Sequence, residues 1–397
     1  MAVAAAVLVA ACTPAGVPEG DATHGDRVAH AAESPEPDAT THHGATATPS
    51  APLRPGERVV DLAMPAAYTP QALTDNGTDD YRCFLLDPGL TSPAFVTGVD
   101  VLPGRPDLVH HVILFRVPPD QLATATAKDA SEPGQGWTCF GGTGIGQEGG
   151  PGASLTSAPW LGAWAPGGGE RLLADDLGMP LEAGSRVVMQ VHYNLLAGQG
   201  DDVSSARLRM ADGTADLTPL QTVLLPAPVE LPCRPEHAGG PLCDREAALL
   251  DVMGRFGEGS GGIAAGLQLL CGDGDFTATP GPVQSCDRGI REVTTVRAVA
   301  GHMHLLGRSI TIEANPGTER ARTLLDVPVW DFDDQRARSL EEPAVLQPGD
   351  VLRVTCRHDQ AARDMLPVFE GKPDRYVLWG EGTTDEMCLA IALVTRP

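Results

Sequence analysis

The stretch VTTVRAVAGHMHLLGRSITIEA (residues 293–314) decides the fold, because its β-branched and apolar residues predict β-strand. Within it, GHMHLLG (301–307) sets His302 and His304 one residue apart. Residues i and i+2 of a strand point to the same face, so both imidazoles can reach one point in space. A single histidine in an apolar strand is more often a hydrogen-bonded core residue than a ligand. Two on one face predict half of a metal site.

Short apolar runs of the same kind recur along the chain and are separated by turn residues such as NPG (315–317) and PGD (348–350). The chain has 46 Gly and 35 Pro, which argues against a mainly helical protein. We therefore predict an all-β fold. The other strands used in this prediction are residues 95–102, 110–117, 185–195, 205–210, 350–359 and 387–394.

A chain of 397 residues is longer than one hydrophobic core usually organises, so two domains with tails are expected. Residues 13–58 have almost no large apolar side chains, which predicts a disordered tether. The stretch near 211–220 marks the boundary between the domains. The predicted division is a signal segment (1–12), the tether (13–58), an N-terminal domain (59–215) and a C-terminal domain (216–397).

The first twelve residues, MAVAAAVLVAAC, are apolar, too short to span a bilayer and end in a cysteine. This pattern is typical of an export signal, and VAAC fits the lipobox of a bacterial lipoprotein, although a basic n-region is missing. We expect export to the bacterial periplasm or cell surface, with a membrane tether through lipidated Cys12.

The formal net charge of −24 argues against nucleic acid as a partner, because binding phosphates requires a basic face. The Gly-rich residues 141–169 contain no GK[ST], so they are not a phosphate-binding loop. A small-molecule substrate is expected, and no protein partner is predicted.

Eight cysteines remain when Cys12 is set aside, and an even number in an exported chain indicates disulfides. They are Cys83, Cys139, Cys233, Cys243, Cys271, Cys286, Cys356 and Cys388. No CxxC occurs, which argues against a zinc ribbon.

A second histidine pair, His110 and His111, is adjacent in the sequence at the start of another apolar run. Neighbouring residues in a regular strand face opposite ways, so joint ligation requires a strand end or a bulge. The preceding PGRPDL is consistent with a strand start. His192, in VVMQVHYNL, would supply a third nitrogen.

Four motifs, in this order, resemble those of the copper type II, ascorbate-dependent monooxygenases, a family that includes peptidylglycine α-hydroxylating monooxygenase and dopamine β-monooxygenase. The motifs are HHVILF (110–115), MQVHYNL (189–195), GHMHLLG (301–307) and TTDEMCLA (383–390). The resemblance extends over residues 80–394. YRC (81–83) and WTC (137–139) also match a cysteine pair that flanks the first histidine motif.

The resemblance implies two copper ions per chain, with O2 and ascorbate or an equivalent reductant as further cofactors. One site, which accepts electrons, would comprise His110, His111 and His192, and the other, where O2 is activated, would comprise His302, His304 and Met387. A thioether is a soft ligand that favours Cu(I), in agreement with the second set. Gln190 and Tyr81 match family positions near the electron-accepting site.

The resemblance also implies two disulfides, Cys83–Cys139 and Cys356–Cys388. The other four cysteines would form two more, and all three connectivities remain open. The implied architecture is two consecutive antiparallel β-sandwich (jelly-roll-like) domains, one per copper site, with a wet cleft between them.

The chain departs from the peptide-amidating members at three positions where those enzymes bind the substrate carboxylate: Ala300, Leu389 and Ile391. A buried carboxylate without a polar partner is costly, so these residues argue against peptidylglycine as the substrate and favour a weakly polar one.

Four polar residues and one segment match no family ligand. Asp385 and Glu386 are interpreted as a solvated turn or as support for the ligands, and His237 and His358 as structural or exposed. Residues 225–286 receive no functional interpretation.

The sequence thus predicts a copper-dependent monooxygenase that hydroxylates a C–H bond of a small, weakly polar substrate with O2 and an external one-electron reductant such as ascorbate. The alternative is a non-catalytic exported copper-binding lipoprotein for storage or delivery. A zinc hydrolase is less well supported, because the nearest acid after the histidine pair is Glu313, nine residues beyond His304.

Overall fold

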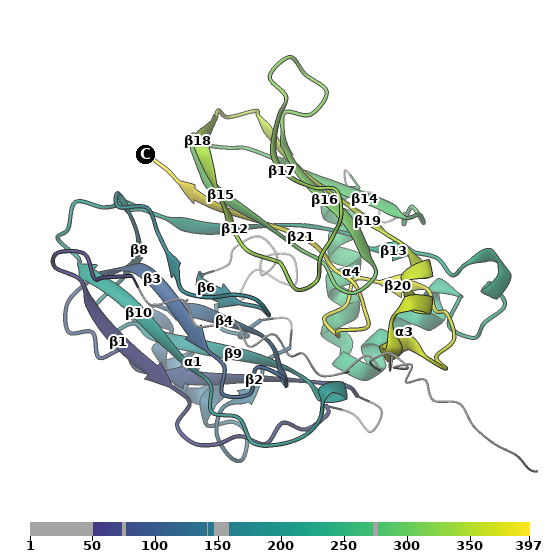
Figure 1. Ribbon diagram of the computed structural model, residues 1–397, viewed down its shortest axis with the longest axis horizontal. Helices are drawn as coiled ribbons and strands as arrows, with labels where there is room; N and C mark the ends of the chain where they lie inside the picture. The colour runs from purple at the N-terminus through teal and green to yellow at the C-terminus, as the bar shows by residue number, and fades with distance from the viewer. Residues whose placement is uncertain (1–50, 74–76, 141, 147–158, 273–276) are drawn as a thin grey trace, which may run out of the picture. The chain divides into compact units, whose positions relative to one another are not determined.

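A computed structural model describes residues 51–397 except 74–76, 141, 147–158 and 273–276 (Figure 1). The predicted signal segment, Cys12 and most of the predicted tether lie outside the described residues. The last tether residues are described and contact the protein, because the Arg209 guanidinium donates hydrogen bonds to the carbonyls of Ala51 and Pro52.

The predicted all-β fold is confirmed, and the strands of residues 58–219 form two sheets. The first has the order β1–β10–β3–β8–β11, with β7 paired to β3, and the second has the order β5–β2–β9–β4–β6. The first sheet contains β1 (Arg58–Ala63), β3 (Ala94–Leu102), β7 (Arg171–Leu172), β8 (Leu177–Leu181), β10 (Ser205–Asp212) and β11 (Thr218–Pro219). The second contains β2 (Asp79–Leu86), β4 (Val109–Val117), β5 (Trp137–Thr138), β6 (Trp160–Trp164) and β9 (Arg186–Asn194).

Alternation along the strands explains why these two sheets pack together. In β10, Ala206, Leu208 and Met210 are fully buried, whereas the intervening Arg207 is exposed. The buried side chains join those of the second sheet, such as Met189, in one hydrophobic cluster. This is the arrangement of a β-sandwich.

The strands of residues 221–395 form two four-stranded sheets and one two-stranded sheet. One sheet has the order β12 (Gln221–Ala227), β21 (Cys388–Thr395), β15 (Thr294–His302), β18 (Arg338–Leu346). The other has the order β14 (Val283–Gly289), β19 (Val351–His358), β16 (Gly307–Ala314), β17 (Arg322–Val327). The short pair is β13 (Glu230–Leu231) with β20 (Val377–Leu378). Among the described strands, those before residue 220 and those after it pair only within their own group, while the predicted boundary between 215 and 216 stays a prediction.

The stretch 293–314 forms two strands, β15 and β16, which belong to different sheets. The chain turns between them, so β15 ends at His302 and His304 lies beyond the strand. The expectation that one strand holds both histidines is therefore wrong. Gly307 begins β16 where a Cβ would come within 2.9 Å of Met303 and Trp330, so the turn requires a glycine there.

Helices occur mainly in the segment that the sequence left without interpretation. They are α3 (Arg245–Phe256) and α4 (Glu258–Cys271); the others described are α1 (Leu122–Asp129), η1 (Pro119–Gln121), η2 (Leu195–Ala197), η3 (Pro235–His237), η4 (Gln360–Met365) and η5 (Pro367–Phe369). None of the helices described is long and apolar enough to cross a membrane.

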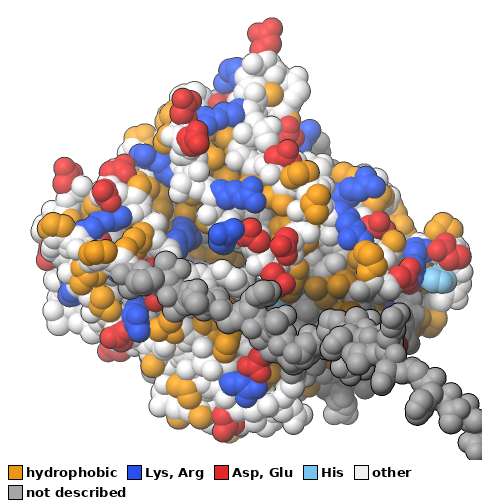
Figure 2. All heavy atoms as spheres, viewed as in Figure 1, with side chains coloured by type: hydrophobic (Ala, Val, Ile, Leu, Met, Phe, Trp, Pro, Cys, Tyr) orange, Lys and Arg blue, Asp and Glu red, His pale blue; other side chains and the backbone are white. Residues whose placement is uncertain are grey.

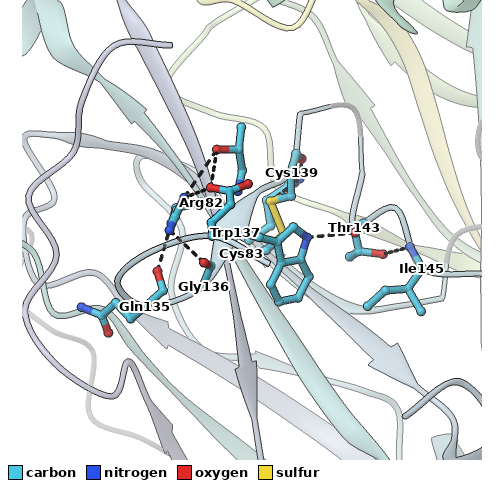
Figure 3. The surroundings of a disulfide bond; sticks show 11 residues. Arg82, Cys83, Gln135, Gly136, Trp137, Cys139, Thr143 and Ile145 are labelled. Atoms are coloured by element: carbon cyan, nitrogen blue, oxygen red, sulfur yellow. Dashed lines mark hydrogen bonds and ion pairs between the residues drawn. A yellow bond between two sulfur atoms is a disulfide. The ribbon is translucent and has the colours of Figure 1, made fainter. Parts of the chain in front are cut away.

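Four disulfides join the eight cysteines. The predicted Cys83–Cys139 and Cys356–Cys388 bonds are confirmed, and the connectivity that was left open is Cys233–Cys243 with Cys271–Cys286. Figure 3 shows Cys83–Cys139 beside Trp137, whose indole N–H donates to the Thr143 carbonyl. Disulfides of this number are consistent with a secreted protein.

The face in Figure 2 shows Lys and Arg side chains interspersed with Asp and Glu. No large basic patch is visible on that face, in keeping with the acidic net charge.

Candidate metal centre

The first histidine group is assembled on β4 and β9 by a break in strand register. Val109 pairs with Tyr193 and His111 pairs with His192, so His110 is the extra residue of a β-bulge. A bulge allows adjacent side chains to point the same way, as the sequence analysis required for joint ligation.

The three rings of this group turn their Nδ1 atoms toward one another. The Nδ1–Nδ1 distances are 2.9 Å for His110–His192, 3.2 Å for His110–His111 and 3.4 Å for His111–His192. Two imidazole nitrogens bound to one metal at about 2.0 Å lie roughly 2.8–3.5 Å apart. The geometry therefore fits one metal ion held by three Nδ1 atoms.

The orientation of His192 is set by Asp79, a residue that sequence reasoning missed. The Nε2–H of His192 donates to Asp79 Oδ1 at 2.9 Å, so the Nδ1 atom keeps its lone pair for a metal. Tyr81 lies two residues away on the same face of β2 and stacks on the His192 ring at a centroid distance of 3.9 Å. Asp79 precedes Tyr81 by two residues in the sequence DDY, so the two side chains were expected on one face of a strand, and this was the available signal for Asp79.

The predicted neighbours of this group are close to it. Tyr81 is fully buried against His192, and burial raises its pKa well above the usual value, so its hydroxyl keeps its proton. The Gln190 amide donates to the Cys139 carbonyl at 2.8 Å and lines the cavity that His111 also lines.

Burial keeps the histidines of both groups neutral, which is the protonation state that metal ligation requires. Burial lowers the pKa of His110, His111 and His192 well below the usual value, and neighbouring rings add to the shift. The pKa of His302 is also lowered by burial, and that of His304 falls to about 4 for the same reason.

The second group presents the opposite ring nitrogens. The Nδ1–H of His304 donates to the Asp385 carbonyl at 3.2 Å, and the Nδ1–H of His302 donates to the Gln335 amide oxygen at 2.5 Å. Both Nε2 atoms therefore carry lone pairs, and that of His304 is buried without a hydrogen-bond partner among the described residues. A buried, unpaired nitrogen is costly unless it is coordinated.

Met387 lies immediately before β21 and close to His302. In the register of β15 with β21, His302 is opposite Leu389, two residues past Met387, and His302 and Met387 line one cavity. Two neutral imidazoles and a soft thioether suit copper, and Cu(I) in particular, better than zinc, calcium or magnesium.

The acidic pair before Met387 is buried, so the solvated-turn interpretation is wrong and the supporting role fits. The Glu386 carboxylate accepts hydrogen bonds from the backbone N–H groups of His304 and Leu306, at 3.0 and 2.5 Å. The carboxylate of Asp385 is held by Arg255 and Arg375, which keep its pKa low although burial raises it.

The two remaining histidines differ in exposure. His358 is buried and donates through Nε2 to the Met387 carbonyl at 3.1 Å, so it supports the methionine rather than serving as a ligand. His237 is half exposed and pairs with Asp374 at 2.9 Å. Both fit the structural or exposed roles expected.

The two groups lie closer together than a wet cleft allows. The ring centroids of His110 and His304 are 6.0 Å apart, and those of His111 and His302 are 6.2 Å apart, both in edge-to-face arrangements. Rings at such separations are in contact, so no water layer lies between these pairs. The expectation of a wet cleft is wrong at this point.

A cavity of about 550 Å³ adjoins both groups. His111 lines it from the first group, and His302 and Met387 line it from the second. The remaining wall is largely apolar or aromatic and includes Phe115, Trp160, Leu224, Trp379, Leu389 and Ile391. A small, mostly apolar molecule would fit beside Met387.

One carboxylate, Glu381, also lines this cavity and was not singled out from the sequence. Burial raises its pKa to about 7, and nearby Asp385 adds to the rise. An acid in this position disfavours a carboxylated ligand, in agreement with the apolar residues at Leu389 and Ile391.

Comparison with known proteins identifies the C-terminal part of the chain. The family model described as copper type II ascorbate-dependent monooxygenase, C-terminal domain, matches residues 283–392. DBH-like monooxygenase protein 2 from Mus musculus is 33% identical over 89 residues, which cover 22% of this chain and 13% of that relative.

The solved structures that match this chain have low TM-scores, so they give no information about its fold. Major capsid protein P2 from bacteriophage PM2 matches at 9% identity over 85% of this chain and 97% of its own, with a TM-score of 0.29. An allantoicase matches at 9% identity over 86% and 90%, with a TM-score of 0.19.

The matched region extends from β14 into β21 and contains His302, His304 and Met387. The fold and the donor atoms define an all-β protein with two histidine-rich groups suited to copper. Residues 283–392 therefore match the C-terminal domain of the copper type II ascorbate-dependent monooxygenase family, which supports the family expected from the sequence motifs.

Proposed function

We propose that this protein is a copper-dependent monooxygenase that hydroxylates a C–H bond of a small, weakly polar substrate, using O2 and an external one-electron reductant such as ascorbate. The observation that carries the proposal is the cavity of about 550 Å³ in which His302 and Met387 adjoin an apolar wall. A protein that only stores or delivers copper has no need of a substrate-sized cavity beside its ligands.

The proposed ligands are the two groups described above, one copper ion to each. His110, His111 and His192 would hold one ion through Nδ1, and His302, His304 and Met387 would hold the other through Nε2 and sulfur. Bound copper supplies the one-electron redox chemistry and O2 activation that no side chain provides.

The side chains of the chain itself select the substrate and position the ligands. Leu389 and Ile391 present apolar surface to the cavity, while Gln190 and Glu381 supply its polar groups. The cavity would orient a C–H bond toward Met387 and His302 and limit water at that point.

The test is reductant-dependent O2 uptake by the copper-loaded protein, with oxygenated product identified by mass spectrometry after reaction in 18O2. Met387→Leu should abolish product formation and remove sulfur scattering from the Cu(I) X-ray absorption spectrum. Met365→Leu is the matched control, because Met365 is exposed and lies outside the cavity. Copper binding without O2 uptake for any candidate substrate would favour the storage alternative.

A further inference from the structure

Two side chains of strand β2 contact both a ligand of the first proposed site and the loop that leads to Met387. Asp79 Oδ1 accepts a hydrogen bond from His192 Nε2 at 2.9 Å, and also from the backbone N and Oγ1 of Thr383 at 3.2 and 2.9 Å. Tyr81 stacks on His192 and donates its hydroxyl proton to the Glu381 carbonyl at 2.5 Å. The same two residues thus contact a ligand of the first group and the loop that leads to Met387.

These contacts are shielded from water. Asp79 and Thr383 are 3% and 2% exposed, and His192 and Tyr81 are fully buried. Hydrogen bonds of a carboxylate in such an environment are strong, and leaving one partner unpaired is costly. A shift of His192 therefore acts on Thr383 through Asp79 more than it would at a surface.

The loop from Thr383 to Met387 transmits such a shift because it is tightly held. The Asp385 N–H donates to the Gly382 carbonyl at 2.8 Å, and the Asp385 carboxylate is fixed by Arg255. A Cβ at Gly382 would approach Asp385 Oδ2 to 2.8 Å, so the loop has little room to move at that end. Packed segments of this kind move together rather than residue by residue.

We propose that Asp79 is a positioning residue that makes metal binding at the two sites interdependent. A metal on His192 Nδ1 makes the Nε2–H a stronger donor, which holds Asp79 where it fixes Thr383 and the loop that carries Met387. Filling the first site then strengthens the second, and linkage requires the second to strengthen the first by the same factor. The inference rests on the proposed copper sites but not on turnover.

The experiment measures the Cu(I) dissociation constant of the second site by anaerobic competition titration, with the first site filled or emptied by His111→Ala. The coupling ratio is the constant with the first site empty divided by that with it filled. Thr383→Val removes the hydroxyl contact to Asp79 and should lower the ratio about fivefold or more. Thr383→Ser keeps the hydroxyl and should retain the wild-type ratio.

Two further variants separate the coupling from general effects. Asp79→Asn should bring the ratio to its lowest value and also weaken the first site about 10–100-fold. Thr294→Val removes another buried threonine hydroxyl, one that donates to the Glu292 carbonyl, and should leave the ratio unchanged. Repulsion between two bound cations is common to all variants and so cancels in the comparison.

Reciprocity provides a second measurement. Emptying the second site by His302→Ala, with no other change, should weaken Cu(I) binding at the first site by the same factor. The same substitution in the Thr383→Val background should weaken it much less.

The outcomes separate this inference from the proposed function. A coupling ratio that is equal in wild type, Thr383→Val and Asp79→Asn overturns the inference, even if the protein consumes O2. A ratio that falls as predicted, in a protein without O2 uptake, supports the coupling and contradicts only the proposed enzymatic function. Loss of the coupling in Thr294→Val as well would also overturn the assignment to Asp79.

Discussion

The two histidine groups position their ligand atoms in different ways. The first is embedded in a five-stranded sheet, where a bulge on β4 and the neighbouring strand β9 bring three Nδ1 atoms within 3.4 Å of one another. The second lies where strands end, at His302 on β15 and Met387 before β21. It presents Nε2 atoms and depends on hydrogen bonds from residues distant in the sequence.

This difference indicates a division of roles. Ligands in a regular sheet lose little conformational entropy on binding, which suits a site that must keep one geometry. Ligands at strand ends leave room for a cavity, which His302 and Met387 line from the second group and His111 lines from the first. The second group is also held by residues outside its own strands, which are Glu386, His358 and the Cys356–Cys388 disulfide.

The largest effects should come from removing one ligand in each group. His192→Ala should abolish the first site and His304→Ala the second, so the copper stoichiometry falls from two to one in both. Sulfur scattering should persist in His192→Ala and be strengthened in relative terms, because only the methionine site remains filled. Retention of two copper ions in either variant would show that the groups are not separate sites.

The disulfide beside the second group should matter more for stability than one away from it. Replacing Cys356 and Cys388 by Ser should lower the free energy of unfolding by about 2–5 kcal/mol, measured by urea denaturation. The Cys233–Cys243 bond closes a shorter loop, with a separation of 10 residues rather than 32, and its removal should cost about 1 kcal/mol less. Equal losses would argue against this ranking.

Glu386→Gln should distinguish the groups by their dependence on external support. The glutamine amide keeps the shape of the side chain but loses the negative charge of the carboxylate, whose two oxygens accept hydrogen bonds from the N–H groups of His304 and Leu306. Copper affinity at the second site should fall about 10–100-fold, while the first site is unchanged. Glu341→Gln, an exposed position on β18, is the control, and equal weakening of both sites would contradict the prediction.

The smallest effect concerns the acid in the cavity. Because burial raises the pKa of Glu381 to about 7, the native state binds its proton more tightly than the unfolded chain does. Its contribution to stability is therefore full at low pH and is lost as the pH rises toward 7, by about 1–2 kcal/mol between pH 5 and pH 7. Glu381→Gln should flatten this part of the pH profile of unfolding, whereas exposed Glu319→Gln should not.

The strands were predictable because their signal is local. The runs 95–102, 110–117 and 387–394 became β3, β4 and β21 with ends shifted by one residue or fewer. Helix α4 was missed because EGSGGIAAGLQLLC contains four glycines, which are poor helix formers. Its apolar Leu267 is fully buried, and the Cys271–Cys286 bond anchors its end, so tertiary contacts override its propensity.

The site was predictable only for side chains whose chemistry stands out in a strand. The two adjacent histidines that had to face one way left a strand end or a bulge as alternatives, and the structure has a bulge at His110. Glu381 gave no such signal, because acidic residues are common in this chain, and Asp79 was marked only by its place two residues before Tyr81. Their roles depend on what lies across from them, His192 in one case and the cavity in the other.

The amino-acid sequence by itself determined the all-β class, the two histidine groups with their methionine, and two of the four disulfides. Strand periodicity, ligand chemistry and motif order are properties of short segments, so they can be inferred without coordinates. Only the tertiary structure decided that His304 lies past the end of its strand, that the two groups are in ring contact, and that the Asp79 carboxylate bonds both His192 and Thr383. Such facts depend on packing between residues far apart in the sequence, such as Tyr81 and Glu381, which are 300 positions apart, and no local pattern encodes such a contact.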